Sequence, residues 1–525
     1  MVSLSKNNTG DTLRNWYSFR FKIVIEGILV GLFSGLSIVA YRFLLGEAYN
    51  FSQWIYNIQR KNPLTIPIWI LCLIIIGLIV SYMIKWEPMA SGSGIPQTEG
   101  VLIGHLSMNW IKVIIAKFVG GILAIVGGLA VGREGPSIQI GAAVGQGFSK
   151  IFKRLKLEEK YLITSGASAG LAAAFNAPIS GVIFALEEIH KSFSPIILTS
   201  ALGASITADF LAKQFFGINP VFDFTVVKML PFKYYGYLIL LGIIIGLSGI
   251  VFNKVMLKTL NLYDSFKFFK GIKKSIPAFL FAALVGLIYP KALGGGHALV
   301  EDLVHGDMTL KLMFILMVVR FFFTMISYGS GAPGGIFLPL LVVGAFMGGI
   351  FGKVLSVTIG LSNGFIINFI ILAMAGYLTA IVKAPITGII LITEMTGSFS
   401  HLLSLAIVCI VAYETTEILG SKPIYEELLH RILKNKGENF ESEEHNKVLI
   451  ELPVSLGSKL EGKKIKEIIW PEKCLIVSIK RGQDEIIPGG NTEILVGDYI
   501  VALTNEGDSI LVNEKLNLLV GENEI

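Results

Sequence analysis

Long apolar runs recur through the first 420 residues of this 525-residue chain and limit what it can fold into. A run of about 20 apolar residues crosses a bilayer as a helix. The chain is 53% hydrophobic and 16% charged, whereas soluble domains are roughly 25% charged. We therefore expect an all-α, multi-span membrane protein with ten or more membrane segments. The clear runs are 23–45, 66–84, 236–252 and 402–420, and shorter or broken ones are 111–131, 164–188, 195–212, 276–290, 312–328, 338–358 and 365–382.

The residues before the first run predict how the chain enters the membrane. Residues 1–22 are polar and basic, with Lys6, Arg14, Arg20 and Lys22, and no small-residue cleavage site follows the run 23–45. A run of this kind is typical of a membrane anchor rather than of a cleaved signal peptide. Basic residues before a first span favour a cytoplasmic N-terminus.

Composition changes sharply near residue 435, which predicts a second domain. Residues 446–525 carry 9 Lys and Arg against 13 Asp and Glu, which gives a net charge of −4. Because the whole chain has a net charge of +6, residues 1–445 have a net charge of +10. The stretch "KNKGENFESEEHNK" between the two parts is charged and lacks apolar periodicity, as linkers do. We divide the chain into a cytoplasmic N-terminal segment 1–22, a membrane domain 23–433, a linker 434–446 and a cytosolic domain 447–525.

The tail has the pattern of a small α+β domain. Its segments "KVLIELPV", "CLIVSIKRGQDEIIP" and "TEILVGDYIVALT" are rich in β-branched residues, and Arg481-Gly482 and Val496-Gly497-Asp498 are turn signals. One short helix is expected in "LEGKKIKEII". The tail has no phosphate-binding loop and no acid–base constellation.

An internal repeat connects the two halves of the membrane part. "NAPISGVIFALE" at 176–187 matches "KAPITGIILITE" at 383–394, and four positions around Gly132 match four around Gly331 in the same order. Repeats in a multi-span protein favour a transporter fold, with the site near the midplane where broken helices of both halves meet. The alternative is a coincidence of helix-packing sequences.

Four apolar segments contain helix breakers and indicate an anion site. They are "SGSGIPQ" (91–97), "GREGPS" (132–137), "GSGAPGGIFLP" (329–339) and "GSKPIYEELL" (420–429). Such breaks survive in a bilayer only inside protein or beside a water-filled cavity. A helix that begins there directs free N–H groups and its positive dipole end at the site, which suits an anion. A single break is better explained as a kink for close packing, but four breaks in a chain with an internal repeat favour a site.

A transported anion must be bound weakly enough to leave again. Partial charges on N–H groups and neutral hydroxyls meet this requirement better than a charged Lys or Arg. Ser93 in "GSGIP" and Tyr425 in "KPIYEE" are the candidate hydroxyls.

These segments resemble the signatures of the CLC family of chloride channels and chloride/proton exchangers. The likeness rests on "GSGIPQ", "GREGPSIQIG", "GLAAAFNAPISGVIFALEE" and "GGIFLP", in this order, and covers roughly residues 20–433. The resemblance implies two inverted halves with broken helices, and a homodimer in the lipid bilayer with one pore per subunit. It also implies cytoplasmic N- and C-termini, and we expect a prokaryotic cell membrane.

The resemblance further implies the residues of a central chloride site. The hydroxyls of Ser93 and Tyr425 and the backbone N–H groups of Ile336 and Phe337 would surround the ion. No catalytic residue and no metal site is expected, and the only cargo is chloride and protons.

The same resemblance assigns an outer site and a proton path. The backbone at Arg133, Glu134 and Gly135 would line the outer anion site, which the Glu134 carboxylate can itself occupy. Glu188, the second acid of "ALEEIH", matches the internal proton-transfer glutamate of the exchangers. Ser93 and Arg133 both stand as in chloride transporters, which favours chloride over fluoride.

An ionised Glu134 carboxylate competes with chloride for one set of N–H donors. Burial favours its neutral form, and a protonated Glu134 leaves the site to chloride. This hypothesis links proton movement to anion movement and predicts a proton-coupled chloride antiporter. A passive voltage- or ligand-gated chloride channel is the alternative.

Two glutamates follow one another in "ALEEIH" and cannot face the same route, because adjacent helical residues point about 100° apart. Glu187 has a repeat counterpart in Glu394, which indicates a structural role for Glu187. An intramembrane ionisable residue is a functional candidate, and Glu188 fits that role. The alternative for Glu188 is a carboxylate that only holds the fold.

The tail resembles the C-terminal half of the RCK (TrkA-C) module of potassium channels and transporters. "LEGKKIKEI" and "IVSIKRGQDEIIPGGNTEILVGDYIVAL" carry this resemblance. It implies dimerisation and a small ligand, with cyclic di-AMP as the candidate, and dimerisation without a ligand is the alternative.

Other functions are disfavoured by the residues. "GASAG" at 166–170 has the G-x-S-x-G pattern of a hydrolase, but its small-residue, apolar surroundings favour helix packing. The three cysteines, Cys72, Cys409 and Cys474, are far apart and imply neither disulfides nor zinc. The basic excess is a topology signal and not a nucleic-acid surface. No enzyme is expected.

Overall fold

The computed structural model describes residues 9–521 except 223, 225–228, 267–270, 306–307, 436–446, 483 and 506–507. The chain forms two compact units, Met1–Ile432 and Leu433–Ile525. Of the expected N-terminal segment, residues 1–8 lie outside the described residues, and so do residues 436–446 of the expected linker.

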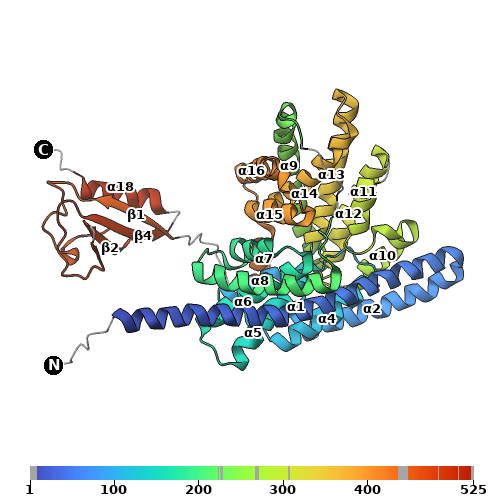
Figure 1. The fold of residues 1–525 in the computed structure, drawn as a ribbon, viewed down its shortest axis with the longest axis horizontal. Helices are drawn as coiled ribbons and strands as arrows, with labels where there is room; N and C mark the ends of the chain where they lie inside the picture. Colours follow the sequence, from blue (N-terminus) through green and yellow to red (C-terminus); the bar gives the residue numbers. More distant parts are fainter. Residues whose placement is uncertain are drawn as a thin grey trace. The chain divides into compact units, whose positions relative to one another are not determined.

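The first half of the larger unit, blue to green in Figure 1, begins with an unusually long helix. No proline occurs before Pro63, and α1 accordingly starts within the expected N-terminal segment and continues far beyond the run 23–45. The helices are α1 (Thr9–Lys61), α2 (Ile66–Trp86), α3 (Ile95–Leu102), α4 (Trp110–Val126), α5 (Glu134–Ile151), α6 (Lys156–Phe175), α7 (Pro178–Phe184) and α8 (Pro195–Phe216). A π-helical stretch, Ala185–His190, continues α7.

The second half, green to orange in Figure 1, repeats the packing of the first. Helix α5 packs on α6 as α13 packs on α14, α1 on α8 as α9 on α16, and α6 on α8 as α14 on α16. This agrees with the repeat in the sequence. The helices are α9 (Tyr235–Ser265), α10 (Ile276–Ile288), α11 (His297–His305), α12 (Leu310–Gly329), α13 (Phe337–Ile359), α14 (Ile366–Val382), α15 (Pro385–Thr396), α16 (Leu402–Ile418) and α17 (Ile424–Asn435).

Within the described residues, eight helices are long and apolar enough to cross a membrane, and two shorter apolar helices accompany them. The expected run 164–188 is not one helix. Asn176 ends α6 in the left-handed conformation (φ 54°), and α7 begins two residues later at Pro178. Proline at the first helical position costs no hydrogen bond, which makes this break inexpensive.

The repeated glutamates join the two halves by capping each other's helices. Glu187 accepts hydrogen bonds from the backbone N–H groups of Ile386 (3.2 Å) and Thr387 (2.8 Å) at the start of α15. Glu394 in turn accepts from the N–H of Ser180 (2.7 Å) and from its hydroxyl at the start of α7. A carboxylate at a helix N-terminus satisfies donors that have no partner within the helix. The structural role expected for Glu187 thus has a physical basis.

The smaller unit is a four-stranded antiparallel sheet with the order β1-β4-β2-β3, and its strands pair in the register Leu449↔Leu503↔Leu475. The elements are β1 (Lys447–Pro453), β2 (Leu475–Arg481), β3 (Asp484–Ile486), β4 (Tyr499–Asn505) and α18 (Ser509–Val520), shown in red in Figure 1. The helix expected in residues 460–469 is wrong, because only the 3-10 turn Ile465–Glu467 forms there. Helix α18 was not expected from the sequence.

The turns of the tail lie where the sequence placed them. Gly482 and Gly497 both adopt positive φ, 61° and 85°. Arg481 donates two 2.8 Å hydrogen bonds to the carboxylate of Asp498. Burial acts to raise the pKa of Asp498, but the bonds from Arg481 and from the Leu495 N–H outweigh it and hold this pKa below its usual range.

We predict that Glu394→Gln lowers the melting temperature of the purified protein. The amide nitrogen of glutamine cannot accept a hydrogen bond, so an N–H group at the start of α7 loses its partner, at a cost of about 1–3 kcal/mol. Thermal unfolding in detergent micelles measures the effect. The matched control is Glu47→Gln at an exposed position on α1, and equal melting temperatures for both variants would contradict the capping role.

Candidate anion-binding site

Three of the four broken segments are tied together by backbone hydrogen bonds. Gly132 and Gly335 form an antiparallel bridge, with N···O distances of 2.7 and 2.8 Å. Gly92 donates to the carbonyl of Gly331 (3.1 Å) and accepts from the N–H of Gly334 (3.0 Å). Backbone groups released by one break thus find partners in another, as a membrane interior requires. The breaks form one site and are not separate kinks.

Close packing at this junction depends on glycine. A Cβ atom placed on Gly135 would lie 2.8 Å from the Cβ and 2.9 Å from the carbonyl oxygen of Ser93. A Cβ on Gly335 would lie 3.1 Å from the backbone nitrogen of Gly135. The starts of α5 and α13 and the turn before α3 therefore meet at van der Waals distance.

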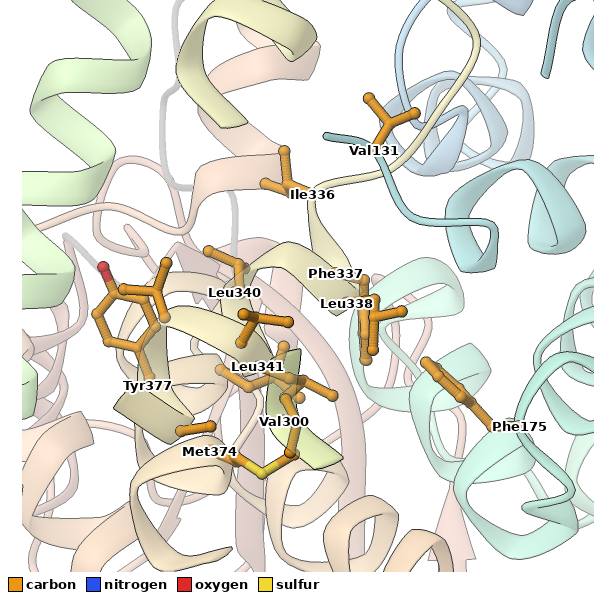
Figure 2. Close-up of a cluster of buried hydrophobic side chains, with 14 of the residues drawn as sticks. Val131, Phe175, Val300, Ile336, Phe337, Leu338, Leu340, Leu341, Met374 and Tyr377 are labelled. Atoms are coloured by element: carbon orange, nitrogen blue, oxygen red, sulfur yellow. The ribbon is translucent and has the colours of Figure 1, made fainter. Parts of the chain in front are cut away.

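The start of α13 presents free amides at this junction. Ile336 is the N-cap residue and Phe337 the first helical residue, and both are buried. No protein acceptor is found for either N–H group in the described part of the chain. The centroid of the Phe337 ring lies 5.6 Å from that of Phe175 (Figure 2). It lies 5.7 Å from the centroid of Phe184. Such a helix start favours an anion.

Two buried hydroxyls lie on the neighbouring segments. The Ser93 oxygen accepts from the N–H of Ile95 (3.3 Å), and the Tyr328 hydroxyl approaches both the side chain and the backbone of Ser93. The Tyr425 hydroxyl at the start of α17 has no partner among the described residues, although Tyr425 is fully buried. Tyr328, Glu188 and Glu134, in this order, act on Tyr425 electrostatically, so the fourth break lies in the region of both glutamates.

Glu134 is the first residue of α5 and is completely buried. Its Oε1 atom lies 3.9 Å from Nε of Arg133. The backbone N–H groups of Glu134 itself and of Leu338 approach the carboxylate without meeting the geometry of full hydrogen bonds. The carboxylate therefore occupies a position between the starts of α5 and α13 and is held only loosely there.

Glu188 lies in the π-helical stretch, within a cluster of charged side chains. It is buried, and its Oε1 atom has no hydrogen-bond partner in the described structure. The charges that act on it include Glu99, Lys191 and Glu426. Lys191 adopts the left-handed conformation (φ 52°) and its Nζ lies 2.7 Å from Oε1 of Glu99. The structure does not place Glu188 among the Ser93, Gly135 and Phe337 contacts.

Two buried cations near the site were missed from the sequence. Lys117 on α4 donates to the carbonyl of Gly92 (2.6 Å), and Arg320 on α12 donates to the carbonyls of Ala292 (2.8 Å) and Gly294 (2.6 Å). The signal was available, because each lies near the middle of an apolar helix, where a charge is expensive.

The structure gives no support to hydrolase chemistry. The "GASAG" segment lies inside α6, where a nucleophile elbow would need a turn between a strand and a helix. The Ser168 hydroxyl in this segment donates to a backbone carbonyl of α8, that of Ala201 (3.3 Å). The described residues contain no group of His, Cys, Asp or Glu that could hold a metal, and Cys72, Cys409 and Cys474 are free.

The family comparison agrees with this geometry. The model of the family described as "Voltage gated chloride channel", the CLC family, matches residues 76–417. The chain belongs to this family. A TrkA-C domain model matches residues 449–517 of the tail.

Curated relatives and solved structures extend the likeness over the membrane unit. The chain is 32% identical to the H(+)/Cl(-) exchange transporter ClcA of Vibrio parahaemolyticus, over 79% of this chain and 91% of the relative. A slow cyanobacterial Cl-/H+ antiporter is 30% identical with a TM-score of 0.75, over 79% of this chain and 99% of that structure. A CLC-type fluoride/proton antiporter is 23% identical with a TM-score of 0.65, over 77% and 97%, and shares the CLC fold.

We predict that Gly135→Ala destabilises the protein because its Cβ would overlap the backbone of Ser93. Overpacking of this kind costs about 1–3 kcal/mol. The matched control is Gly46→Ala on α1, where a Cβ meets no atom within 4 Å. Melting temperature in micelles is the measurement, and a Gly135→Ala protein as stable as the control would contradict the close contact between α5 and the Ser93 turn.

Proposed function

We propose that the protein exchanges chloride for protons across a membrane, and that the Glu134 carboxylate is the gate. The observation that carries the proposal is the position of Glu134, buried between the starts of α5 and α13 and without a full hydrogen bond in the described structure. An anion at this position competes with the carboxylate for the same donors. The relatives named as H(+)/Cl(-) exchange transporters support the same reading.

The central chloride site in this proposal consists of two amides and two hydroxyls. Ile336 and Phe337 provide the N–H groups, and Ser93 and Tyr425 provide the O–H groups. These donors carry only partial charges, so the ion is held without being trapped. A buried tyrosine hydroxyl without a partner is costly, and a chloride ion that accepts its hydrogen would remove this cost.

The outer site comprises the backbone at Arg133, Glu134 and Gly135, and it is occupied in turn by the carboxylate and by chloride. Protonation removes the charge that holds the Glu134 side chain there, and chloride then enters. Glu188 is proposed as the internal proton-transfer residue, since its carboxylate is buried and its Oε1 atom has no partner among the described residues. In this proposal, protons and chloride take different routes between the gate and the cytoplasm. Protons pass by Glu188, and chloride passes through the central site.

We also propose a homodimer in a prokaryotic cell membrane, with both termini in the cytoplasm. Helices α7, α8, α15 and α16 adjoin one another and carry exposed apolar side chains, and a second copy would cover such a surface. These exposed side chains include Ile206 and Phe210 on α8 and Leu403 and Ile410 on α16.

The tail is proposed to be a regulatory dimerisation module. The match to a TrkA-C domain supports this role. The register Leu449↔Leu503↔Leu475 places three leucines on one face of the sheet, and Leu449 and Leu475 are 59% and 63% exposed. Cyclic di-AMP is the ligand proposed for this module.

In reconstituted vesicles under a chloride gradient, we expect the wild-type protein to move chloride and protons in opposite directions. Glu134→Gln mimics the protonated side chain, so chloride flux should persist while proton flux is lost. Parallel recording with a chloride electrode and a pH electrode measures both fluxes.

Glu188→Gln tests the proton path without changing the gate. We expect this variant to lose proton flux as well, although its outer anion site is unchanged. The exposed Glu47→Gln is the control and should behave as the wild type. Chloride movement without proton movement in the wild type would contradict exchange and would establish a passive channel instead.

For the tail, we expect cyclic di-AMP to release heat on titration into the purified full-length protein and to change its chloride flux. A chain ending at residue 435 should transport chloride without responding to the ligand. Absence of heat at saturating cyclic di-AMP would contradict this ligand and leave dimerisation as the role of the tail.

A further inference from the structure

We propose that the protein has a second anion site, in a cavity beside the gate, that binds a small organic monocarboxylate. The cavity has a volume of about 470 Å³ and lies next to Arg133, Val131 and Leu338. Pockets of this size, mainly apolar with a few converging polar groups, are typical of sites for small molecules. Binding of the carboxylate does not depend on the function proposed above. The expected inhibition of chloride transport rests on that proposed function.

Arg42 on α1 is the anchoring cation of this site. Its Nη1 atom donates to the carbonyl of Ala173 (3.1 Å) and to Oδ1 of Asn176 (2.7 Å), both at the end of α6. Its guanidinium lies 4.2 Å from the ring centroid of Phe216. Nη2 and Nε make no hydrogen bond to any described residue. The guanidinium is therefore held in one orientation with free donors, as bidentate binding of a carboxylate requires.

Arg133 contributes a second guanidinium to the same cavity. Its buried Nε atom has no hydrogen-bond partner in the described part of the chain, and its only nearby carboxylate is that of Glu134, at 3.9 Å. An anion in the cavity would meet the exposed part of the Arg133 side chain, which is 25% exposed. It would also weaken the attraction of Arg133 for the gate.

Three guanidiniums and two carboxylates, those of Glu134 and Glu301, lie in or beside the cavity, which leaves one net positive charge. A Cβ on Gly296, which lines the cavity, would lie 3.0 Å from the guanidinium of Arg320, so a third cation stands behind this wall. The one lining carboxylate, Glu301, is more than half exposed. Both ring nitrogens of His297 already have partners. Nε2 lies 2.8 Å from the carbonyl oxygen of Val221, and Nδ1 lies 3.4 Å from Oε1 of Glu301. Walls of one charge sign raise the local concentration of the opposite ion.

The walls select the kind of anion. Aromatic and aliphatic side chains, including those of Leu45, Tyr49, Phe175 and Phe216, form most of the lining. A multiply charged phosphate would lose its hydration against such walls without enough partners. A monocarboxylate with an apolar body satisfies the guanidiniums and buries apolar surface at the same time.

The position of the cavity predicts from which side such an anion acts. Arg42 lies 33 residues after Thr9, about 50 Å along the axis of α1. With a cytoplasmic N-terminus, the cavity opens on the external side. A carboxylate bound there stands beside Glu134 and obstructs the exchange of chloride between the gate and the outside.

The test uses benzoate as the probe and the full-length protein. Calorimetric titration of benzoate into the purified protein is expected to give saturable binding, and external benzoate is expected to reduce chloride efflux from vesicles. Acetate, which lacks the apolar body, should bind more weakly. Arg42→Gln should raise the half-saturating benzoate concentration about tenfold, as loss of a charge-assisted contact does. Lys291→Gln, which removes an exposed cation paired with Asp302, should leave binding unchanged.

Because Arg42 also caps α6, a second variant keeps the test independent of folding. Gly46 lines the cavity and a Cβ there meets no atom within 4 Å, so Gly46→Leu adds a side chain to the cavity without a clash at its first atom. It should abolish benzoate binding in a protein that melts as the wild type does. Equal benzoate binding in wild type, Arg42→Gln and Gly46→Leu would overturn the site, as would no binding to the wild type. A wild type that binds benzoate but moves no chloride would contradict the proposed function alone.

Discussion

The backbone of a membrane protein must satisfy its own hydrogen bonds, and the membrane unit of this chain depends on how its broken helices do so. The Gly132–Gly335 bridge and the contacts of Gly92 with Gly331 and Gly334 join the breaks in pairs. Because the Gly132–Gly335 bridge joins the residues just before α5 and α13, the N-termini of these two helices lie next to each other. The amides that remain free there define the anion site. Glycine is required because a Cβ would enter the neighbouring backbone.

The buried cations near the site, Lys117 and Arg320, form hydrogen bonds with backbone carbonyls only, and no carboxylate pairs with them in the described structure. A carbonyl satisfies the hydrogen-bonding capacity of a cation without cancelling its charge. Positive potential therefore persists in the region of the breaks, where the free amides add to it. A paired carboxylate in place of these carbonyls would have removed the attraction for a mobile anion.

Much of this arrangement followed from the sequence, and the remainder required tertiary contacts. The breaks at Gly132–Ser137 and Gly329–Pro339 were evident because glycine and proline interrupt apolar runs. The start of α1 at Thr9 and the short turn at Ile465–Glu467 were not, because local pattern sets the boundaries of elements only weakly. The orientation of Arg42 depends on the end of α6, which is 131 residues away. No local pattern could have indicated it.

The surroundings of four buried or capping carboxylates separate those that hold the fold from those that can move. Glu187 and Glu394 each accept hydrogen bonds from backbone N–H groups and a hydroxyl, so their displacement would leave several donors unpaired. Glu134 and Glu188 have carboxylate oxygens without such partners in the described structure, so rotation or protonation costs them little hydrogen bonding. The repeat that produced Glu187 and Glu394 as a matched pair gave no counterpart to Glu188, because position 395 is Met395. The two capping glutamates, Glu187 and Glu394, thus occupy matching positions of the repeat, whereas Glu188, the acid proposed to carry protons, occurs in one half only.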